Sequence, residues 1–410
     1  MGDVDTMEES EVEKSAPWGL ARISHRDSLS FGTFNKYLYA AEGGEGVDAY
    51  TIDTGINVDH VDFEGRAHWG KTIPTNDEDI DGNGHGTHCS GTIAGKKYGV
   101  AKKANVHAVK VLRSSGSGTM SDVIKGVEWA VESHNRKSKA AKDGKAKGFK
   151  GSVANMSLGG GKSPTLEIAV NAGVEAGVHF AVAAGNDNAD ACDSSPAAAE
   201  NAVTVAASTL ADERAYFSNY GKCTDIFAPG LNILSTWTGS KHAVNTISGT
   251  SMASPHIAGL LAYFVSLQPS KDSAFAVADI TPEKLKKDLI KIATKGALDD
   301  VPSDTPNVSF TSLNMSDSNM LTCFFSSSPG TVVAPPTTPR LSRAVATTLL
   351  LVALRLPLTG WSTRPRNSLR SSVPSTARSR MFLWLKFREW ATQCCLGQPS
   401  LVTCYMEWVD

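Results

Sequence analysis

The sequence lacks an excess of charge of either sign, because 40 Lys and Arg residues stand against 42 Asp and Glu residues in 410. Proteins that bind nucleic acid or anionic membranes through a broad basic surface carry a clear surplus of positive charge. The balance therefore gives no reason to expect nucleic acid or a membrane as a partner.

Long apolar segments are also missing. The longest apolar run, residues 344–354, is well short of the roughly 20 residues that a membrane-spanning helix needs. Residues 1–15 are acidic, whereas a secretory signal peptide begins with basic residues and continues with about 7–15 apolar ones. We therefore expect no membrane span, and no signal peptide is visible.

Cysteine is scarce, and its count of seven is odd. A dense disulfide scaffold is thereby excluded, and at least one thiol has no partner within the chain. After residue 307 stand Cys323, Cys394, Cys395 and Cys404, which leaves Cys89, Cys192 and Cys223 before it.

Between about Ala16 and Asn307, short apolar runs alternate with amphipathic stretches, as in a parallel sheet covered by helices. Buried strands are predicted at residues 47–53, 106–112, 152–158, 178–185 and 202–208. Helices are predicted to begin at a cap at Ser121 or Asp122 and at Pro282. The expected fold class is α/β, with a mostly parallel sheet and helices on both faces.

Two other stretches are predicted to be irregular. The Lys-rich residues 134–150 are typical of a solvated surface loop. Residues 308–410 are rich in Ser, Thr, Pro and Arg, and four of the eight tryptophans are scattered there without periodicity. This composition favours disorder over a second domain.

Residues 75–88, TNDEDIDGNGHGTH, allow different chemistries. A calcium loop beginning at Asp77 needs a carboxylate at its twelfth position, where this chain has His88. A zinc site at His85 and His88 lacks both an HExxH pattern and a third ligand nearby. The remaining interpretation is that His85, placed after a glycine-rich turn, is a catalytic base.

A base of this kind needs an orienting carboxylate and a nucleophile. Asp53 ends an apolar run directly before Thr54-Gly55, and ligands collect at such strand ends. Ser251 precedes an apolar helix, where free backbone N–H groups can stabilise an oxyanion. Each residue alone has a common structural explanation. Together, in the order Asp, His, Ser, they match one known catalytic triad order.

The segments DTGIN at Asp53, GHGTHCSGTIAG around His85 and GTSMASPH around Ser251, supported by SLGG from Ser157 and AAGN from Ala183, carry a family resemblance. The chain resembles the subtilisin-type serine proteases (peptidase family S8) of the proteinase K branch, and among them the fungal vacuolar, cerevisin-like enzymes. The resemblance covers about residues 16–307 and implies the three-layer subtilisin-like fold.

Outside that region the chain departs from its relatives. Residues 1–15 resemble the end of a pro-peptide or linker. Residues 308–410 replace a short apolar closing segment of the relatives, and we interpret them as disordered or as a gene-model artefact.

The resemblance implies a serine endopeptidase that works through an acyl-enzyme, with Ser251 as nucleophile, His85 as base and Asp53 as its orienting group. The Asn186 side chain and the Ser251 N–H would stabilise the oxyanion. It also implies a substrate site with broad specificity for apolar and aromatic side chains. Its residues would be two substrate-binding segments (Gly116 and Ser117; Ser157, Leu158 and Gly159), an apolar subsite residue (Met120) and the primary pocket walls (Ala183, Ala184 and Gly185).

Other expectations come from the same relatives. Some of them join the positions of Cys192 and Cys223 by a disulfide. Many bind calcium, but the matching position here is Thr209, so we expect no metal and no other cofactor.

The expected partners are peptide or protein substrates and an inhibitory pro-domain, and the expected state is a monomer. The expected location is the vacuole or the secreted fraction, and mould relatives are also known as allergens. The alternatives are a catalytically inactive binding protein of the same fold and a calcium-binding structural module.

Overall fold

The computed structural model of the chain describes residues 10–269 and 280–310. Most of the predicted tail, with its four cysteines, lies outside the described residues. Within them, no helix is long and apolar enough to cross a membrane.

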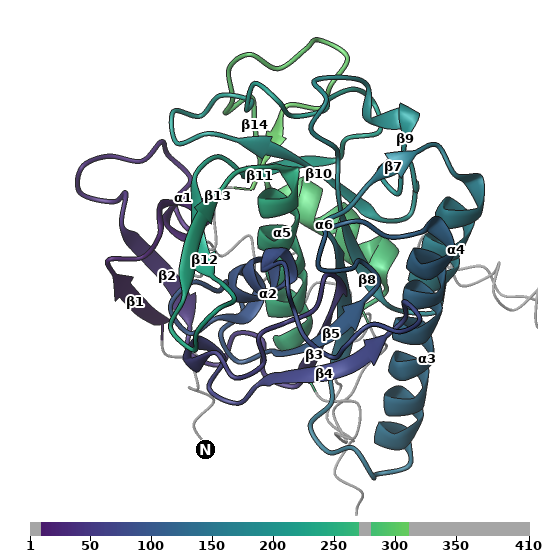
Figure 1. Cartoon of the computed structure of the whole chain (residues 1–410). Coiled ribbons are helices and arrows are strands. Elements are labelled where there is room, and N and C mark those ends of the chain that lie inside the picture. The colour runs from purple at the N-terminus through teal and green to yellow at the C-terminus, as the bar shows by residue number, and fades with distance from the viewer. Residues whose placement is uncertain (1–9, 270–279, 311–410) are drawn as a thin grey trace, which may run out of the picture. The chain divides into compact units, whose positions relative to one another are not determined.

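The main sheet has the strand order β14-β15-β11-β10-β8-β6-β3-β5-β4 and is parallel except for the pairing of β14 with β15 (Figure 1). Its central strands are buried along their whole length, as expected of strands covered on both faces. The strands are β3 (Val47–Asp53), β4 (Ala67–Thr72), β5 (Asn105–Lys110), β6 (Gly151–Met156), β8 (His179–Ala183), β10 (Val203–Ser208), β11 (Ile226–Pro229), β14 (Thr294–Lys295) and β15 (Val308–Ser309).

Further strands form two-stranded sheets: β1 (Ser10–Lys14) with β2 (Lys36–Ala40), β7 (Gly160–Gly161) with β9 (Ser194–Ser195), and β12 (Ile233–Thr236) with β13 (Val244–Ile247). The helices are α1 (Trp18–Ile23), α2 (His85–Ala94), α3 (Met120–Lys142), α4 (Pro164–Glu175), α5 (Thr250–Ser266) and α6 (Pro282–Ile292), with the short 3-10 helices η1 (Val61–Phe63) and η2 (Ala191–Asp193).

Helices cover both faces of the main sheet, and each face has its own hydrophobic core. On the face of α2 and α5, Ile257 of α5 shares a buried cluster with Val205 of β10. On the face of α3 and α4, Val127 and Val170 share a second cluster with Ile52 of β3. The predicted α/β fold with helices on both faces is confirmed.

The predicted strands are confirmed within a few residues, and β3 has the predicted bounds. Helix α6 begins at Pro282 as predicted, and the Thr281 side chain before it accepts the Lys284 N–H. The cap predicted at Ser121 or Asp122 is wrong, because Thr119 accepts the Asp122 N–H and α3 begins at Met120.

The predicted loop over residues 134–150 is wrong in its first half, because α3 continues to Lys142. His134 and Ala141 are buried on the inner face of this helix, while Lys125 and Lys139 are exposed. The Lys-rich composition therefore reflects the solvated face of a helix.

The two ends of the described region pack against its core. In the predicted pro-peptide remnant, β1 pairs with β2, and Glu13 forms an ion pair with Lys102 (2.8 Å). At the other end, β15 and the fully buried Phe310 lie beyond Asn307, the residue at which the packed region was predicted to end. Both ends therefore extend past the predicted boundaries.

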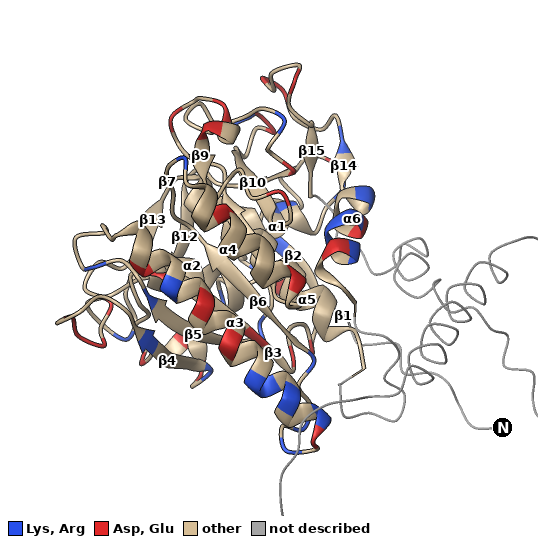
Figure 2. Ribbon diagram, turned by 90° about the vertical axis from the view of Figure 1, so that its right-hand side faces the viewer, with Lys and Arg blue, Asp and Glu red and all other residues tan. Residues whose placement is uncertain are grey.

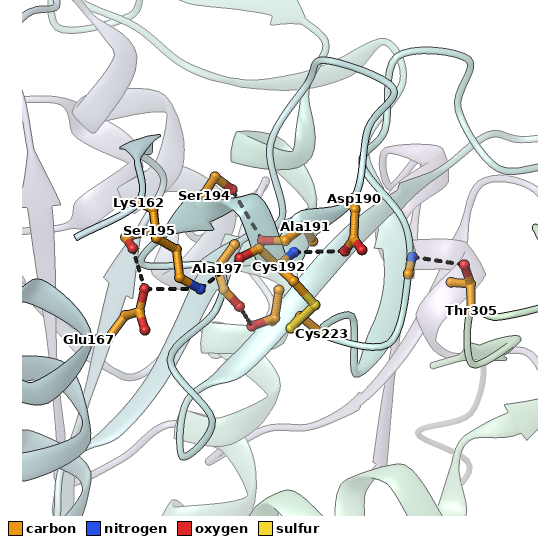
Figure 3. The surroundings of a disulfide bond; sticks show 12 residues. Lys162, Glu167, Asp190, Ala191, Cys192, Ser194, Ser195, Ala197, Cys223 and Thr305 are labelled. Carbon is orange, nitrogen blue, oxygen red and sulfur yellow. Dashed lines mark hydrogen bonds and ion pairs between the residues drawn. A yellow bond between two sulfur atoms is a disulfide. The ribbon is translucent and has the colours of Figure 1, made fainter. Parts of the chain in front are cut away.

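Cys192 and Cys223 form the disulfide that the resemblance implied, and it joins η2 to the segment before β11 (Figure 3). The surrounding loop is held by short hydrogen bonds. The Cys192 N–H donates to Asp190 (2.8 Å), and Lys162 donates to the Cys192 carbonyl (2.6 Å).

Removing this disulfide should destabilise the fold. The bond closes a loop between positions 31 residues apart, and the chain-entropy estimate for such a loop is about 3–4 kcal/mol. We expect the double variant Cys192→Ser/Cys223→Ser to lose about that much free energy of unfolding in urea. Recovery of both thiols free in the unaltered protein by mass spectrometry would contradict the pairing.

Candidate active site

The parallel sheet brings several predicted site residues to one edge. β6 lies between β3 and β8 and runs parallel to both, so the carboxyl ends of all three strands meet there. Asp53 is the last residue of β3, Ser157 follows β6, and Asn186 follows β8 after a short turn. In parallel sheets this edge is where ligands bind.

Asp53 and His85 form a buried pair at this edge. The His85 Nδ1 atom lies 2.8 Å from Asp53 Oδ1 and 3.0 Å from Oδ2. The Asp53 side chain is fully buried, whereas that of His85 is 25% exposed. Asp53 Oδ1 also accepts the Thr54 N–H (2.7 Å). Because a carboxylate beside Nδ1 favours a proton on that atom, Nε2 is left to accept one.

The environment raises the pKa of His85. Burial alone lowers this pKa, but the charge of Asp53 and its hydrogen bond together outweigh that effect. His88 shows the opposite result, since burial lowers its pKa to about 4 and its Nε2 lies 2.9 Å from the Ile233 carbonyl. His88 is thus a structural residue, and the two histidines do not form the shared zinc site considered as an alternative.

The acidic residues before His85 also turn to separate partners. Asp81 is buried and accepts the Gly84 N–H (2.8 Å) and the Thr87 N–H (2.9 Å) at the start of α2. Asp77 faces Lys110 and Arg113, at 3.8 and 3.7 Å. These contacts do not form a calcium loop. Asp81 instead anchors the helix that begins with His85, a role that the sequence analysis missed because Asp81 lies three residues before the N-cap position, Gly84.

Ser251 is the second residue of α5, and its backbone contacts α2 and the segment after β6. The Ser251 carbonyl accepts hydrogen bonds from the Ser157 hydroxyl (2.7 Å) and the Cys89 thiol (3.4 Å). The sulfur of Cys89, one turn after His85, lies within 4.8 Å of ligand atoms of both Asp53 and His85. Burial raises the pKa of this thiol well above its ordinary value.

The Ser251 hydroxyl donates to the Ser157 carbonyl (3.3 Å). Its expected hydrogen bond to His85 is not among the contacts of the described residues. Catalytic hydrogen bonds of this kind often tighten only when substrate is in place.

Asn186 is oriented by the residue beside the serine. Its Oδ1 accepts both the Thr250 N–H (2.8 Å) and the Thr250 hydroxyl (3.0 Å), so its amide Nδ2 is directed elsewhere. A Cβ atom built on Gly249 would lie 3.6 Å from both Asn186 Oδ1 and the Ser251 nitrogen, and 3.7 Å from Asn186 Nδ2. The Asn186 amide and the Ser251 nitrogen therefore both lie close to Gly249, and an oxyanion site requires two such donors near each other.

The buried Asn219 holds the turn that carries Asn186. Its Nδ2 donates to the Ala184 carbonyl (3.0 Å), and its Oδ1 accepts the Asp187 N–H (2.9 Å). Gly185 adopts a positive φ of 107°, and a Cβ there would approach Asn219 Nδ2 to 2.3 Å. Neither Asn219 nor Thr250 was predicted. Thr250 could have been suspected as the neighbour of Ser251, but Asn219 has no such signal in the sequence.

A groove of about 450 Å³ runs past His85. The predicted substrate residues that line it are Gly116, Ser117, Met120, Ser157, Leu158 and Gly159. Leu112, Val123 and Leu166 add apolar surface that the sequence analysis did not predict. The predicted pocket walls Ala183, Ala184 and Gly185 are not among its lining residues, and Ala184 is fully buried.

A family model described as the subtilase family matches residues 45–310. The chain is 77% identical over 382 residues to the subtilisin-like serine protease pepC of Aspergillus niger. The matched residues make up 92% of this chain and 72% of that protein. It is 87% identical over 306 residues to alkaline protease 2 of Aspergillus fumigatus. Here the matched residues make up 75% of this chain and 62% of that protein. The chain thus spans roughly two thirds of these relatives.

Among solved structures, a cold adapted subtilisin-like serine proteinase is similar with a TM-score of 0.63 and 42% identity. The match covers 73% of this chain and 100% of that one. The structural similarity therefore extends over the whole chain of that proteinase.

The pKa of His85 can be measured by NMR titration of its imidazole C–H signals. We expect a value above the ordinary 6.5. In Asp53→Asn the raising charge is lost while burial remains, so the pKa should fall below 6.5. The signals of His88, with a pKa of about 4, serve as the control that stays neutral in both proteins above pH 6. An unchanged His85 value in Asp53→Asn would contradict the proposed coupling.

Proposed function

The chain belongs to the subtilase family, and we propose that it is a serine endopeptidase whose catalytic triad is Asp53, His85 and Ser251. The observation that carries this proposal is the buried Asp53–His85 pair beside a groove, with Ser251 held next to the same helix. The proposed substrates are peptides and proteins.

In the proposed reaction, Ser251 Oγ leaves the Ser157 carbonyl and attacks the peptide carbonyl carbon, while its proton passes to His85 Nε2. The positive charge that forms on the imidazole is stabilised by the carboxylate of Asp53. The same interaction raises the pKa of His85 before substrate binds. His85 then gives the proton to the leaving amine, and an acyl-enzyme remains. Water, activated by His85, releases the acyl group in the second half of the reaction.

Charge on the former carbonyl oxygen needs donors at the place where it forms. The Ser251 N–H and the Asn186 amide both lie close to Gly249 and are assigned this role. Thr250 and Asn219 are positioning residues, since they hold Asn186 and its turn through hydrogen bonds.

The groove indicates how a substrate would lie. The segments at Gly116 and at Ser157 both line it, and we assign their backbone groups to the binding of an extended peptide. Apolar side chains line it, and none of its lining residues in the described part of the chain is Asp, Glu, Lys or Arg. We therefore assign the enzyme a broad preference for apolar and aromatic side chains, with Met120 in an outer subsite.

The disulfide and the family resemblance support the proposed location and partners. The Cys192–Cys223 disulfide favours an oxidising compartment, so we place the protein in the secretory pathway, as a secreted or vacuolar enzyme. A monomeric state and control by an inhibitory pro-domain are proposed from the family resemblance. The alternative to the enzyme is a catalytically inactive binding protein of the same fold. Covalent labelling of Ser251 distinguishes the two.

Covalent labelling tests the nucleophile. A fluorophosphonate probe should attach to Ser251, and mass spectrometry of the digested protein should identify that residue. Ser251→Ala should remain unlabelled, and His85→Ala should label far more slowly because the base is lost. A protein that binds peptides but stays unlabelled at Ser251 would support the inactive alternative.

The Asn186 amide can be tested by two substitutions of different geometry. Asn186→Ala removes the donor, and Asn186→Asp keeps an oxygen for Thr250 but also removes the donor. Both should lower kcat for a peptide amide by about 10²–10³-fold with little change in KM. If Asn186→Asp keeps full kcat, the role of Asn186 is to hold Thr250, and the proposed donor is wrong.

A further inference from the structure

At the opposite edge of the main sheet, Lys286 of α6 reaches a group of oxygen atoms. Its Nζ donates to the Glu200 carbonyl (2.8 Å) and the Ala202 carbonyl (2.6 Å). It also forms an ion pair with Asp225 Oδ2 (2.8 Å). The Lys286 side chain is 17% exposed and that of Asp225 22% exposed, so the contact is largely shielded from solvent. We call the oxygens of Glu200, Ala202 and Asp225 the oxygen cage.

Asp225 is held beside the start of β10 by contacts that do not involve the lysine. Residues 200 and 202 precede β10, and Asp225 precedes β11. Asp225 Oδ2 accepts the Thr204 N–H (2.8 Å), and the Asp225 N–H donates to the Thr204 carbonyl (2.9 Å). We therefore expect the carboxylate to stay beside the start of β10 when the side chain from α6 is shortened.

This donor set is one that hard cations prefer. Calcium binds backbone carbonyls and carboxylates at about 2.3–2.6 Å. An ion that close to the same three oxygens would overlap with the Lys286 ammonium, so the cage does not fit a metal while the lysine is present. Thr209, the position matched to a calcium-binding residue of relatives, does not fit one either, because its hydroxyl accepts the Ala211 N–H (3.2 Å) and the Glu213 N–H (3.3 Å).

We propose that Lys286 is a built-in cation that occupies a cage able to take a hard divalent cation such as Ca²⁺, and that it fastens α6 to the sheet without a metal. The proposal concerns stability and does not depend on the proposed catalytic function. Burial raises the pKa of Asp225, and the Lys286 charge opposes that rise. Without a cation, a shielded carboxylate would lack a countercharge, which is destabilising.

The adjacent Lys287 offers a matched control. It lies on the same helix, its side chain is 71% exposed, and among the described residues it forms an ion pair with the exposed Glu283. Figure 2 shows that α6 carries both acidic and basic residues on its surface. Loss of Lys287 removes the same charge from the same helix without opening the oxygen cage.

The test compares melting temperatures of the full chain in a Ser251→Ala background, which prevents self-digestion, with EDTA or with millimolar CaCl₂. In EDTA, Lys286→Ala should melt about 5–10 °C lower than the parent, and Lys287→Ala within about 1 °C of it. Added Ca²⁺ should raise the melting temperature of Lys286→Ala by several degrees more than that of the parent or of Lys287→Ala.

A second variant tests whether any calcium-induced shift of the melting temperature arises at the oxygen cage. In Asp225→Asn/Lys286→Ala the carboxylate is gone, so the extra calcium-induced shift should disappear, and calorimetric titration should show one Ca²⁺ fewer than in Lys286→Ala. Equal calcium shifts in parent and Lys286→Ala would overturn the proposal, as would failure of Lys286→Ala to fold in either condition. Folding of Lys286→Ala only when Ca²⁺ is present would support it.

Discussion

The hydrogen-bonded pair of Asp53 and His85 is the contact on which the site depends. A carboxylate without a partner is costly to bury, and here the His85 ring and the Thr54 N–H satisfy it. In return, its charge fixes the ring orientation and raises the pKa of His85. The pair exists only because β3 ends at Asp53 and α2 begins at His85, and Asp81 holds the first turn of that helix in place.

The two edges of the sheet differ in what their polar groups are free to do. At the carboxyl edge, His85 and Asn186 each have one side-chain polar atom bound to a neighbouring residue, which leaves the His85 Nε2 and Asn186 Nδ2 atoms for the proposed chemistry. At the amino edge, Lys286 forms an ion pair with Asp225 and donates hydrogen bonds to two nearby carbonyls. One edge is thus suited to chemistry, and the other holds a helix to the sheet.

Much of this organisation was predictable from local patterns. Continuous apolar runs predicted β3, β6, β8 and β10 closely, because strands buried on both faces must be apolar throughout. Composition alone was misleading where a helix faces solvent: the lysines of α3 indicated a loop, although His134 and Ala141 continue its buried face. Residues that act through distant partners, such as Asn219, had no local pattern to reveal them.

The sequence by itself determined the chemical identity of the site, because aspartate, histidine and serine stand in a characteristic order beside glycine turns and strand or helix ends. Only the tertiary structure decided which atoms meet. It turned the Ser251 hydroxyl to the Ser157 carbonyl, and it placed Lys286 among oxygens more than 60 residues away along the chain. Such contacts depend on how strands and helices pack in three dimensions, and spacing along the chain does not encode that packing locally.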